Sequence, residues 1–473
     1  MAEAAPRATP DGRRPSVLAV FDRPLTIRDA AIVFALALAV RWINAWLLIG
    51  VENAFRFEDS AEYIEGARRW LERGSLAAYV EGRPLLPLER EPGYFWFLSG
   101  IASLFGESLP AVALVQGAVD AGTCVLIGLL AARLGPAVAR LAGLGAALWP
   151  TLVVHAAVVL QDTLLLFFLT GFLVALVRYA ARPSFGLAVA AGLLFGAAWL
   201  VRGIMQFLPL LIALALAALA WWRSRRPGLA AAAPLLFLGA MLVPLAPHAY
   251  RNVAVFHTTM SSTQAGLHAL HWTVTLVHMD RNGTTFEVEA PRTEARYRAW
   301  LQASGISEKD LNPFEIDRLR MKLAFQELLE FPVWRLAKVW TQGAAINLLS
   351  PAVLSDSRVR ALPRPSFYGT PGKNLFERAA KYFLQDAGTF QLVVLAGLAA
   401  SLLAFLLQLW GYAVLARRSL LAAAAAALFV GYFLAVSGPT AGPKYRMPFE
   451  PVMIVLFALG LDAARRRRLA RRG

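Results

Sequence analysis

The feature of this sequence that most restricts its fold is a series of long apolar stretches. Crossing a membrane takes about 20 apolar residues, and a crossing segment must satisfy its own backbone hydrogen bonds, as a helix does. Ten stretches approach or reach this length, at about 28–50, 109–133, 136–156, 159–180, 184–202, 204–222, 229–250, 388–416, 419–437 and 449–463, and a weaker one covers 333–352. The sequence therefore predicts an all-α, polytopic transmembrane bundle of about 10 to 12 spans.

Composition agrees with a membrane protein. Of the 473 residues, 58% are hydrophobic and 16% are charged, whereas soluble domains are roughly 25% charged. The single cysteine, Cys124, lies in an apolar stretch, which excludes an internal disulfide framework and cysteine-based metal centres. The net charge of +16 is largely explained by basic residues in short loops, so it does not indicate a nucleic-acid partner.

The basic residues predict the orientation, because Lys and Arg collect in short cytoplasmic loops. Those flanking the stretches fall on one face of the predicted bundle: Arg13, Arg14, Arg23, Arg133, Arg140, Arg178, Arg182, Arg223, Arg225, Arg226, Arg417, Arg418 and the run from Arg465 to Arg472. Both termini are expected in the cytoplasm, with the first stretch kept as a signal anchor. Residues 51–108 and 251–387, with the turns at 155–162, Arg202 and 437–448, then face the periplasm.

This topology divides the chain into five regions. They are a cytoplasmic tail (1–27), a transmembrane module (28–250) containing the first outer loop (51–108), a periplasmic loop (251–387), a C-terminal transmembrane module (388–463) and a basic cytoplasmic tail (464–473). The outer segments contain three predicted helices: one from Asp59 to Gly74 whose apolar side rests on the membrane surface, an interfacial one over 92–106, and an amphipathic one over 313–332.

Two acidic residues on the outer face are candidates for catalysis. Asp59, preceded by Glu58, lies shortly after the first stretch, and Asp162 lies at the outer end of a predicted hairpin. A carboxylate at this boundary could be a general base or hold a cation, since burial and neighbours tune its pKa. The alternative for both aspartates is that they only cap the helices that follow them.

Several charged residues lie at or within the predicted spans. Arg202, Arg251, Lys444 and Arg446 lie at outer ends, where they could clamp an anionic lipid phosphate or only extend to ordinary headgroups. Arg41 and Asp120 lie inside apolar stretches. Isolated charges there are costly and face a partner or a cavity, so we predict that Arg41 and Asp120 form an architectural pair.

Motifs for other chemistries are weak or missing. All six histidines (His155, His248, His257, His268, His271 and His278) map to the outer face, and His268 and His271 have the helical i, i+3 spacing of some metal ligands. Without an HExxH pattern or a cysteine partner this signal is weak, and a divalent metal is not required by the sequence. The sequence lacks GxxxxGK[ST], GxGxxG and GxSxG motifs, which disfavours a nucleotide-driven reaction.

A set of motifs in a fixed order resembles a known superfamily. The motifs are FEDSAEYIEGARRWL, REPGYFWFL, VQGAVDAGTCVLIGLLAARLG, QDTLL, Arg202 at the end of a stretch, PHAYRN and PKYRMPFEP. Together they resemble the polytopic GT-C glycosyltransferases, specifically the bacterial relatives of protein O-mannosyltransferases and of lipid A aminoarabinose transferases. One departure is AGLHALHW after PHAYRN, where the family often has a Gly-Asn-containing stretch.

The resemblance implies roles for individual residues. The family's catalytic carboxylate in the first outer loop matches Asp59, with Glu58 as the less favoured substitute, and its second outer acidic position matches Asp162. The segments carrying Arg202, Arg251, Lys444 and Arg446 match regions that line the donor cavity, and Arg90 of REPGYFWFL joins this donor-phosphate set. The first seven spans would form the shared module and the last three a variable one.

The expected function is transfer of a sugar from a polyprenyl-phosphate donor, with inversion. The acceptor would be lipid A or lipopolysaccharide, another glycolipid or a protein, on the periplasmic face of a bacterial inner membrane. Two alternatives stay open. A secondary transporter would use Arg41 and Asp120 as a coupling pair, and a lipid-linked polysaccharide ligase or polymerase would share the donor chemistry.

Overall fold

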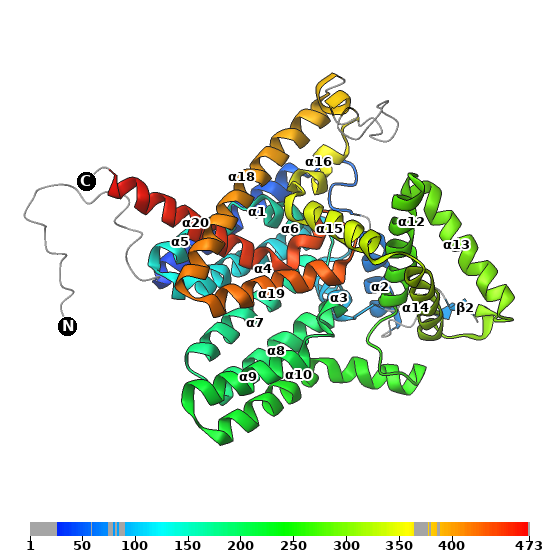
Figure 1. The fold of residues 1–473 in the computed structure, drawn as a ribbon, viewed down its shortest axis with the longest axis horizontal. Helices are drawn as coiled ribbons and strands as arrows, with labels where there is room; N and C mark the ends of the chain where they lie inside the picture. Colours follow the sequence, from blue (N-terminus) through cyan, green and yellow to red (C-terminus); the bar gives the residue numbers. More distant parts are fainter. Residues whose placement is uncertain are drawn as a thin grey trace, which may run out of the picture.

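The computed structural model of the protein describes residues 26–57, 59–73, 79–80, 83–84, 90–363, 377, 380–385 and 388–471. Within these ranges the regular elements are helices, apart from the antiparallel pair β1 (Tyr79–Val80) and β2 (Arg83–Pro84). The predicted all-α class is therefore confirmed. Figure 1 shows a bundle of long helices with a smaller group, α12 to α14, to one side of it.

Among the described residues, seven helices are long and apolar enough to cross a membrane. They are α1 (Ile27–Leu47), α4 (Leu109–Ala131), α7 (Asp162–Ala181), α10 (Pro227–Phe256), α18 (Thr389–Arg418), α19 (Leu420–Ser437) and α20 (Glu450–Ala470). An eighth span results if α5 (Pro136–Ala147) and α6 (Pro150–Ala157), which are bent by 41°, count as one. The bend lies at Pro150, because proline disfavours helical geometry in the residue before it, and Trp149 is extended.

Two shorter apolar helices occupy the other predicted stretches. α8 (Phe185–Val201) and α9 (Pro209–Ser224) have 17 and 16 residues. Glycines allow α8 to lie directly on α10, because a methyl group on Gly192 or Gly196 would overlap the carbonyl oxygen of Phe237 or Met241. Such close backbone approach is typical of helix contacts in membranes. The described residues thus contain seven or eight candidate spans, with α8 packed among them.

The group beside the bundle, called the side group below, follows α10. It consists of α11 (Gln264–Leu267), the π-helix η4 (His268–Val274), α12 (Thr275–Asn282), α13 (Phe286–Ala303), α14 (Pro313–Leu329) and α15 (Val333–Leu349). α14 is the predicted amphipathic helix, with Asn312 and Glu315 forming a capping box at its start. α15 covers the weaker span candidate, but its Arg335 and Lys338 are bound to Asp280 of α12 at 3.0 and 2.5 Å.

Short turns connect these elements. They are the 3₁₀ turns η2 (Ala132–Leu134), η3 (Gly203–Met205), η5 (Glu308–Asp310), η6 (Ala352–Ser355) and η8 (Pro443–Phe449), the short helix α16 (Ser357–Arg360) and the π-turn η7 (Lys381–Gln385). Of these, η3 and η8 matter most for the site, because η3 follows Arg202 and η8 contains Lys444.

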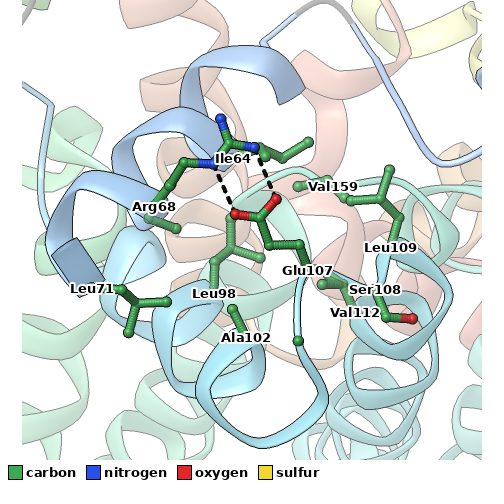
Figure 2. A pocket seen from close by; sticks show the side chains of 12 residues that line it. Ile64, Arg68, Leu71, Leu98, Ala102, Glu107, Ser108, Leu109, Val112 and Val159 are labelled. Carbon is green, nitrogen blue, oxygen red and sulfur yellow. Dashed lines mark hydrogen bonds and ion pairs between the residues drawn. The ribbon is translucent and has the colours of Figure 1, made fainter.

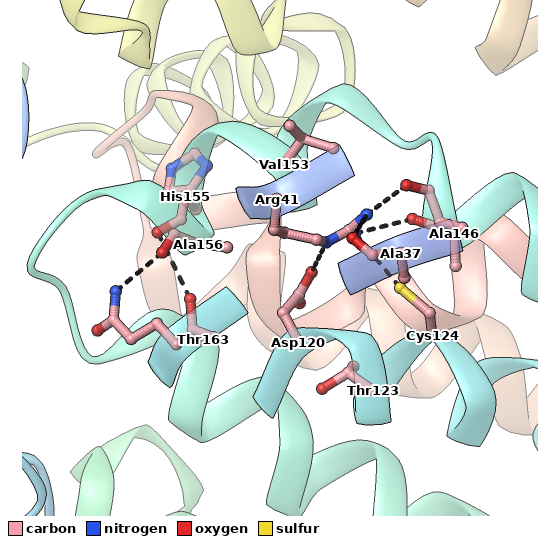
Figure 3. Close-up of polar contacts among 12 residues, drawn as sticks. Ala37, Arg41, Asp120, Thr123, Cys124, Ala146, Val153, His155, Ala156 and Thr163 are labelled. Carbon is pink, nitrogen blue, oxygen red and sulfur yellow. Dashed lines mark hydrogen bonds and ion pairs between the residues drawn. The ribbon is translucent and has the colours of Figure 1, made fainter. Parts of the chain in front are cut away.

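The predicted pair of Arg41 and Asp120 is present in the structure. Arg41 Nε donates to Asp120 Oδ2 at 2.7 Å, and both side chains are 1% exposed. The same guanidinium donates to the carbonyl oxygens of Ala146, at 3.0 Å, and Ala147 (Figure 3). One buried ion pair therefore ties α1 to α4 and to the end of α5, as an architectural role requires.

The first outer loop contains the predicted helices α2 (Ser60–Arg73) and α3 (Gly93–Phe105). Part of the apolar side of α2 is buried within the protein, since Ala67 is 5% exposed, whereas Leu71 is 47% exposed. Its Ile64 and Leu71 line a small cavity of about 40 Å³ together with Leu98 of α3, and Arg68 closes the edge with both oxygens of Glu107 at 2.8 Å (Figure 2). α2 is thus held by contacts within the protein, which fixes the position of its first residues.

Candidate active site

Asp59 immediately precedes α2 and faces two basic side chains from distant segments. Lys444 Nζ lies 3.4 Å from Asp59 Oδ2, and Arg90 Nη2 lies 3.8 Å from Oδ1. The Asp59 side chain is 34% exposed, whereas those of Lys444 and Arg90 are 13% and 12% exposed. The arrangement is a reachable carboxylate between two largely covered cations.

The surroundings of Asp59 decide its protonation. Burial opposes ionisation, but the positive charges of Lys444, Arg90 and Arg202 outweigh burial and hold the pKa of Asp59 below its usual range. The carboxylate is therefore ionised at neutral pH. It can accept a proton from a hydroxyl group brought within hydrogen-bonding distance.

A second acid and base meet beside this group. Asp162 begins α7, and its Oδ1 lies 2.8 Å from Nη1 of Arg202 at the end of α8. Ser60, which follows Asp59, connects the segments that carry the two acids. Its Oγ donates at 2.7 Å to the carbonyl oxygen of Val159, three residues before Asp162. The structure thus brings Asp59, Asp162, Arg90, Arg202 and Lys444 to one end of the bundle. We call these five residues the charged cluster.

Two members of α2 that the sequence analysis missed hold Arg90 in place. Arg90 Nε donates to Glu62 Oε1 at 2.7 Å and Nη1 donates to the Tyr63 hydroxyl at 3.2 Å. Burial raises the pKa of Tyr63 above its usual value, so its hydroxyl keeps its proton. Glu62 and Tyr63 follow Asp59 by three and four residues, a spacing that places them on the same helix face and could have indicated them.

The side group supplies two further polar residues next to the charged cluster: Gln264, which the sequence patterns did not indicate, and His268, which they indicated only as a weak metal ligand. With its amide oxygen toward the guanidinium, Gln264 accepts from Arg90 Nε and Nη1 at 3.0 and 3.3 Å. His268 follows one turn later. Burial, reinforced by the charges of Arg202 and Lys444, lowers its pKa to about 4. α11 and η4 therefore add neutral hydrogen-bonding groups next to the charged cluster.

The other predicted phosphate-binding residues are placed differently. Arg446 is buried, with its guanidinium bound to Glu450 Oε2 at 3.1 and 3.2 Å and to the carbonyl oxygen of Leu348 at 3.2 Å. It therefore ties η8 to α15 and α20. Arg251 lies on α10, where it donates to Asn252 Oδ1 at 3.3 Å and covers the ring of Phe256. Glu58 lies outside the described residues.

The histidines predicted as a weak metal signal do not converge. The ring of His271 contacts the rings of Trp272 and Phe286 edge-on, and His278 pairs with Glu327 at 2.8 Å. Within the described part of the chain, no group of three or more His, Cys, Asp or Glu side chains is placed to hold a metal ion.

The charged cluster can support one kind of chemistry particularly well. An ionised, accessible carboxylate can deprotonate an incoming hydroxyl, and fixed cations can stabilise negative charge that develops on a leaving group. Arg90 and Arg202 are each held by an acidic partner, so their positions are set before a ligand arrives. Preorganised charge of this kind avoids reorganisation during the reaction.

The middle of the chain matches the sequence profile of a known protein family. The profile of the dolichyl-phosphate-mannose-protein mannosyltransferase family matches residues 87–250, a segment that includes Arg90, Asp162 and Arg202 of the charged cluster. The match confirms the resemblance seen in the sequence motifs. A comparison with curated proteins found no match.

Two solved structures also resemble the chain. The crystal structure of ArnT from Cupriavidus metallidurans in the apo state is 17% identical, with a TM-score of 0.37 over 91% of this chain and 76% of that one. The structure of ArnT from the same organism bound to undecaprenyl phosphate is 18% identical, with a TM-score of 0.37 over 92% and 77%.

Proposed function

We infer that this chain, whose residues 87–250 match the profile of the dolichyl-phosphate-mannose-protein mannosyltransferase family, transfers a sugar from a polyprenyl-phosphate donor to a hydroxyl group. The chain is a membrane glycosyltransferase that uses a sugar linked to a lipid phosphate. The acceptor is lipid A or lipopolysaccharide, another glycolipid, or a protein. The observation that carries the proposal is the ionised Asp59 carboxylate between Lys444 and Arg90.

The proposed reaction is a single displacement. Asp59 takes the proton of the acceptor hydroxyl, whose oxygen forms a bond to the anomeric carbon while the bond from that carbon to the phosphate oxygen breaks. The electron pair leaves with the lipid phosphate, where Lys444, Arg90 and Arg202 stabilise the charge. Asp162 holds Arg202 for this purpose. Attack from the side opposite the leaving group inverts the anomeric configuration.

The proposal includes the finer topology. The α8 and α9 helices are about 24 to 26 Å long at 1.5 Å per residue, which approaches the hydrocarbon thickness of about 27 to 30 Å. Counting both with the eight candidate spans gives ten crossings. Seven lie before the side group, in the module 28–250, and three lie after it, in the module 388–463. Both termini then face the cytoplasm of a bacterial inner membrane, with the charged cluster on the periplasmic side.

The pH dependence of transfer gives a prediction for Lys444. Of the positive charges that lower the pKa of Asp59, that of Lys444 has the largest effect. Replacing Lys444 by Met should therefore raise this pKa. Because the base must be deprotonated, the acidic limb of the kcat/KM profile should move to higher pH, with a larger loss of rate at acidic than at neutral pH.

The control for this variant is Lys338→Met. Lys338 pairs with Asp280 in the side group, so its removal takes away a lysine charge without touching the charged cluster. The measurement is the kcat/KM of the two variants from acidic to alkaline pH. An acidic limb that stays at its wild-type position in Lys444→Met would contradict the assignment of Asp59 as the base.

The proposed function itself is tested by mass spectrometry of envelope glycolipids and glycoproteins. A strain that lacks the gene should lose one sugar-sized mass from a single class of glycoconjugate, and the wild-type chain should restore it. This result also names the acceptor. Loss of a whole polymer would favour a ligase or polymerase, and an unchanged set of glycoconjugates would favour transport.

A further inference from the structure

Glu91 is a buried carboxyl group that the proposed reaction does not use. It follows Arg90 directly, precedes α3 and is 4% exposed. Its Oε1 accepts from the hydroxyl of Ser261 at 3.3 Å, and further hydrogen bonds come from Ser262 and the backbone N–H of Gly203. Burial raises the pKa of Glu91 despite these bonds. Its surroundings therefore use it as a hydrogen-bond acceptor rather than as one half of an ion pair.

The segment that contains Glu91 fits tightly against the end of α8. A methyl group on Gly203 would overlap Oε1 of Glu91, and one on Gly93 would lie 2.7 Å from the carbonyl oxygen of Leu200. Gly203 begins η3 and follows Arg202 in the chain. The carboxyl group of Glu91 is thus packed directly against the backbone that carries Arg202, with no room for an added side chain.

Glu91 also contacts the segment that leads into the side group. The Ser261 hydroxyl that binds Glu91 accepts from Trp199 Nε1 at 3.3 Å, and its carbonyl oxygen lies 2.6 Å from His248 Nε2. Three residues after Ser261, Gln264 contacts the guanidinium of Arg90. A displacement of Glu91 would therefore reach Arg90 both through the chain and through Gln264.

We propose that Glu91 is a positioning residue that sets the spacing of Arg90 and Arg202, the two arginines that receive the phosphate of the lipid donor. This inference rests on the proposed function. Arg90 directly precedes Glu91 in the chain. Arg202 directly precedes Gly203, whose backbone N–H donates to Glu91. Glu91 acts through its shape and its acceptor oxygens, so a neutral side chain of the same size can replace it in this role.

Three variants separate this role from a general effect on folding. Glu91→Ala removes the acceptor, and Gly203→Ala pushes a methyl group against it. Each should weaken phosphate binding by about tenfold, because a small displacement of the charged groups that bind a ligand lowers the affinity strongly. In the double variant the alanine at position 91 leaves room for the new methyl group. The double variant should therefore bind no worse than Glu91→Ala, a non-additivity that residues in contact show.

Two further variants serve as rescue and control. Glu91→Gln keeps the size of the side chain and an acceptor oxygen, and serine hydroxyls can accept from its amide. It should bind within about threefold of wild type, because it keeps the shape of the side chain and an acceptor for the backbone N–H of Gly203. Glu289→Gln alters another buried carboxyl group, bound to Asn282, Thr284 and Arg292 in the side group, and should leave binding unchanged.

The measurement is the affinity of the purified full-length chain for undecaprenyl phosphate, with thermal unfolding of each variant recorded alongside. Equal, weakened binding of Glu91→Ala, Gly203→Ala and their combination, with recovery in Glu91→Gln, supports the proposal. Wild-type affinity of a folded Gly203→Ala, additive losses in the double variant, or a loss in Glu91→Gln as large as in Glu91→Ala would overturn it. A wild-type chain that does not bind the lipid phosphate would instead contradict the proposed function.

Discussion

Replacing Asp59 by Asn is expected to lower sugar transfer by at least about 100-fold, the lower end of what a positioned general base contributes, while the protein still folds. Asparagine has nearly the same size and caps helices as well as aspartate does, but it cannot accept the proton. The variant therefore separates the two interpretations of Asp59, as a base and as a cap. The measurement is the amount of sugar-modified product that it restores in a strain lacking the gene.

The control for Asp59→Asn is Glu107→Gln. Glu107 is another carboxylate of the first outer loop, 54% exposed and paired with Arg68, and it lies outside the charged cluster. At equal expression it should restore the product as wild type does. If Asp59→Asn also restores the product fully, Asp59 is a helix cap and the catalytic assignment fails.

Replacing Arg41 by Met should have the largest effect on stability. It leaves Asp120 buried without its cation and also frees the carbonyl oxygens of Ala146 and Ala147. Removing one partner of a buried ion pair typically costs about 3 to 5 kcal/mol, because an uncompensated charge stays behind. The expected result is a large fall in the midpoint of thermal unfolding in detergent and in the yield of folded protein.

Two comparisons test this explanation. The double variant Arg41→Met with Asp120→Leu removes both charges and should recover most of the lost stability, because apolar side chains can replace a buried pair. Arg298→Ala breaks an exposed pair with Glu294, where the side chains are 76% and 47% exposed, and should change stability by less than about 1 kcal/mol. Similar losses in Arg41→Met and Arg298→Ala would contradict an architectural role for the buried pair.

The features of the fold that depend on local sequence patterns could be predicted from the sequence. Long apolar stretches place the spanning helices, because hydropathy over about 20 residues is sufficient to recognise them. The pairing of Arg41 with Asp120 was predictable because two isolated charges in apolar stretches must find partners. The helix after Asp59 was predictable from its capping pattern. The ion pair of Arg446 with Glu450 also has a local signal, the i, i+4 spacing, which the sequence analysis overlooked.

Long-range packing determines the features that sequence patterns miss. The contact of Gln264 with Arg90, and the position of His268 near Arg202, depend on how α11 and η4 fold back toward the first outer loop. No periodicity reports such a contact. The packing of α2 against α3 and the start of α4, which buries Ala67 and leaves Leu71 47% exposed, could not be predicted from sequence. The lengths of α8 and α9 depend on turns such as η3, whose ends a hydropathy window does not resolve.

Transfer of a sugar from a lipid phosphate to an acceptor at the charged cluster can be measured with purified protein. The assay uses the protein in lipid vesicles, a polyprenyl-phosphate donor with a labelled sugar, and the glycoconjugate fraction of a strain lacking the gene. The label should move to the acceptor with inverted anomeric configuration, and free polyprenyl phosphate should appear in equal amount. Label that stays on its carrier, or crosses the membrane still attached to it, would rule out sugar transfer by this chain.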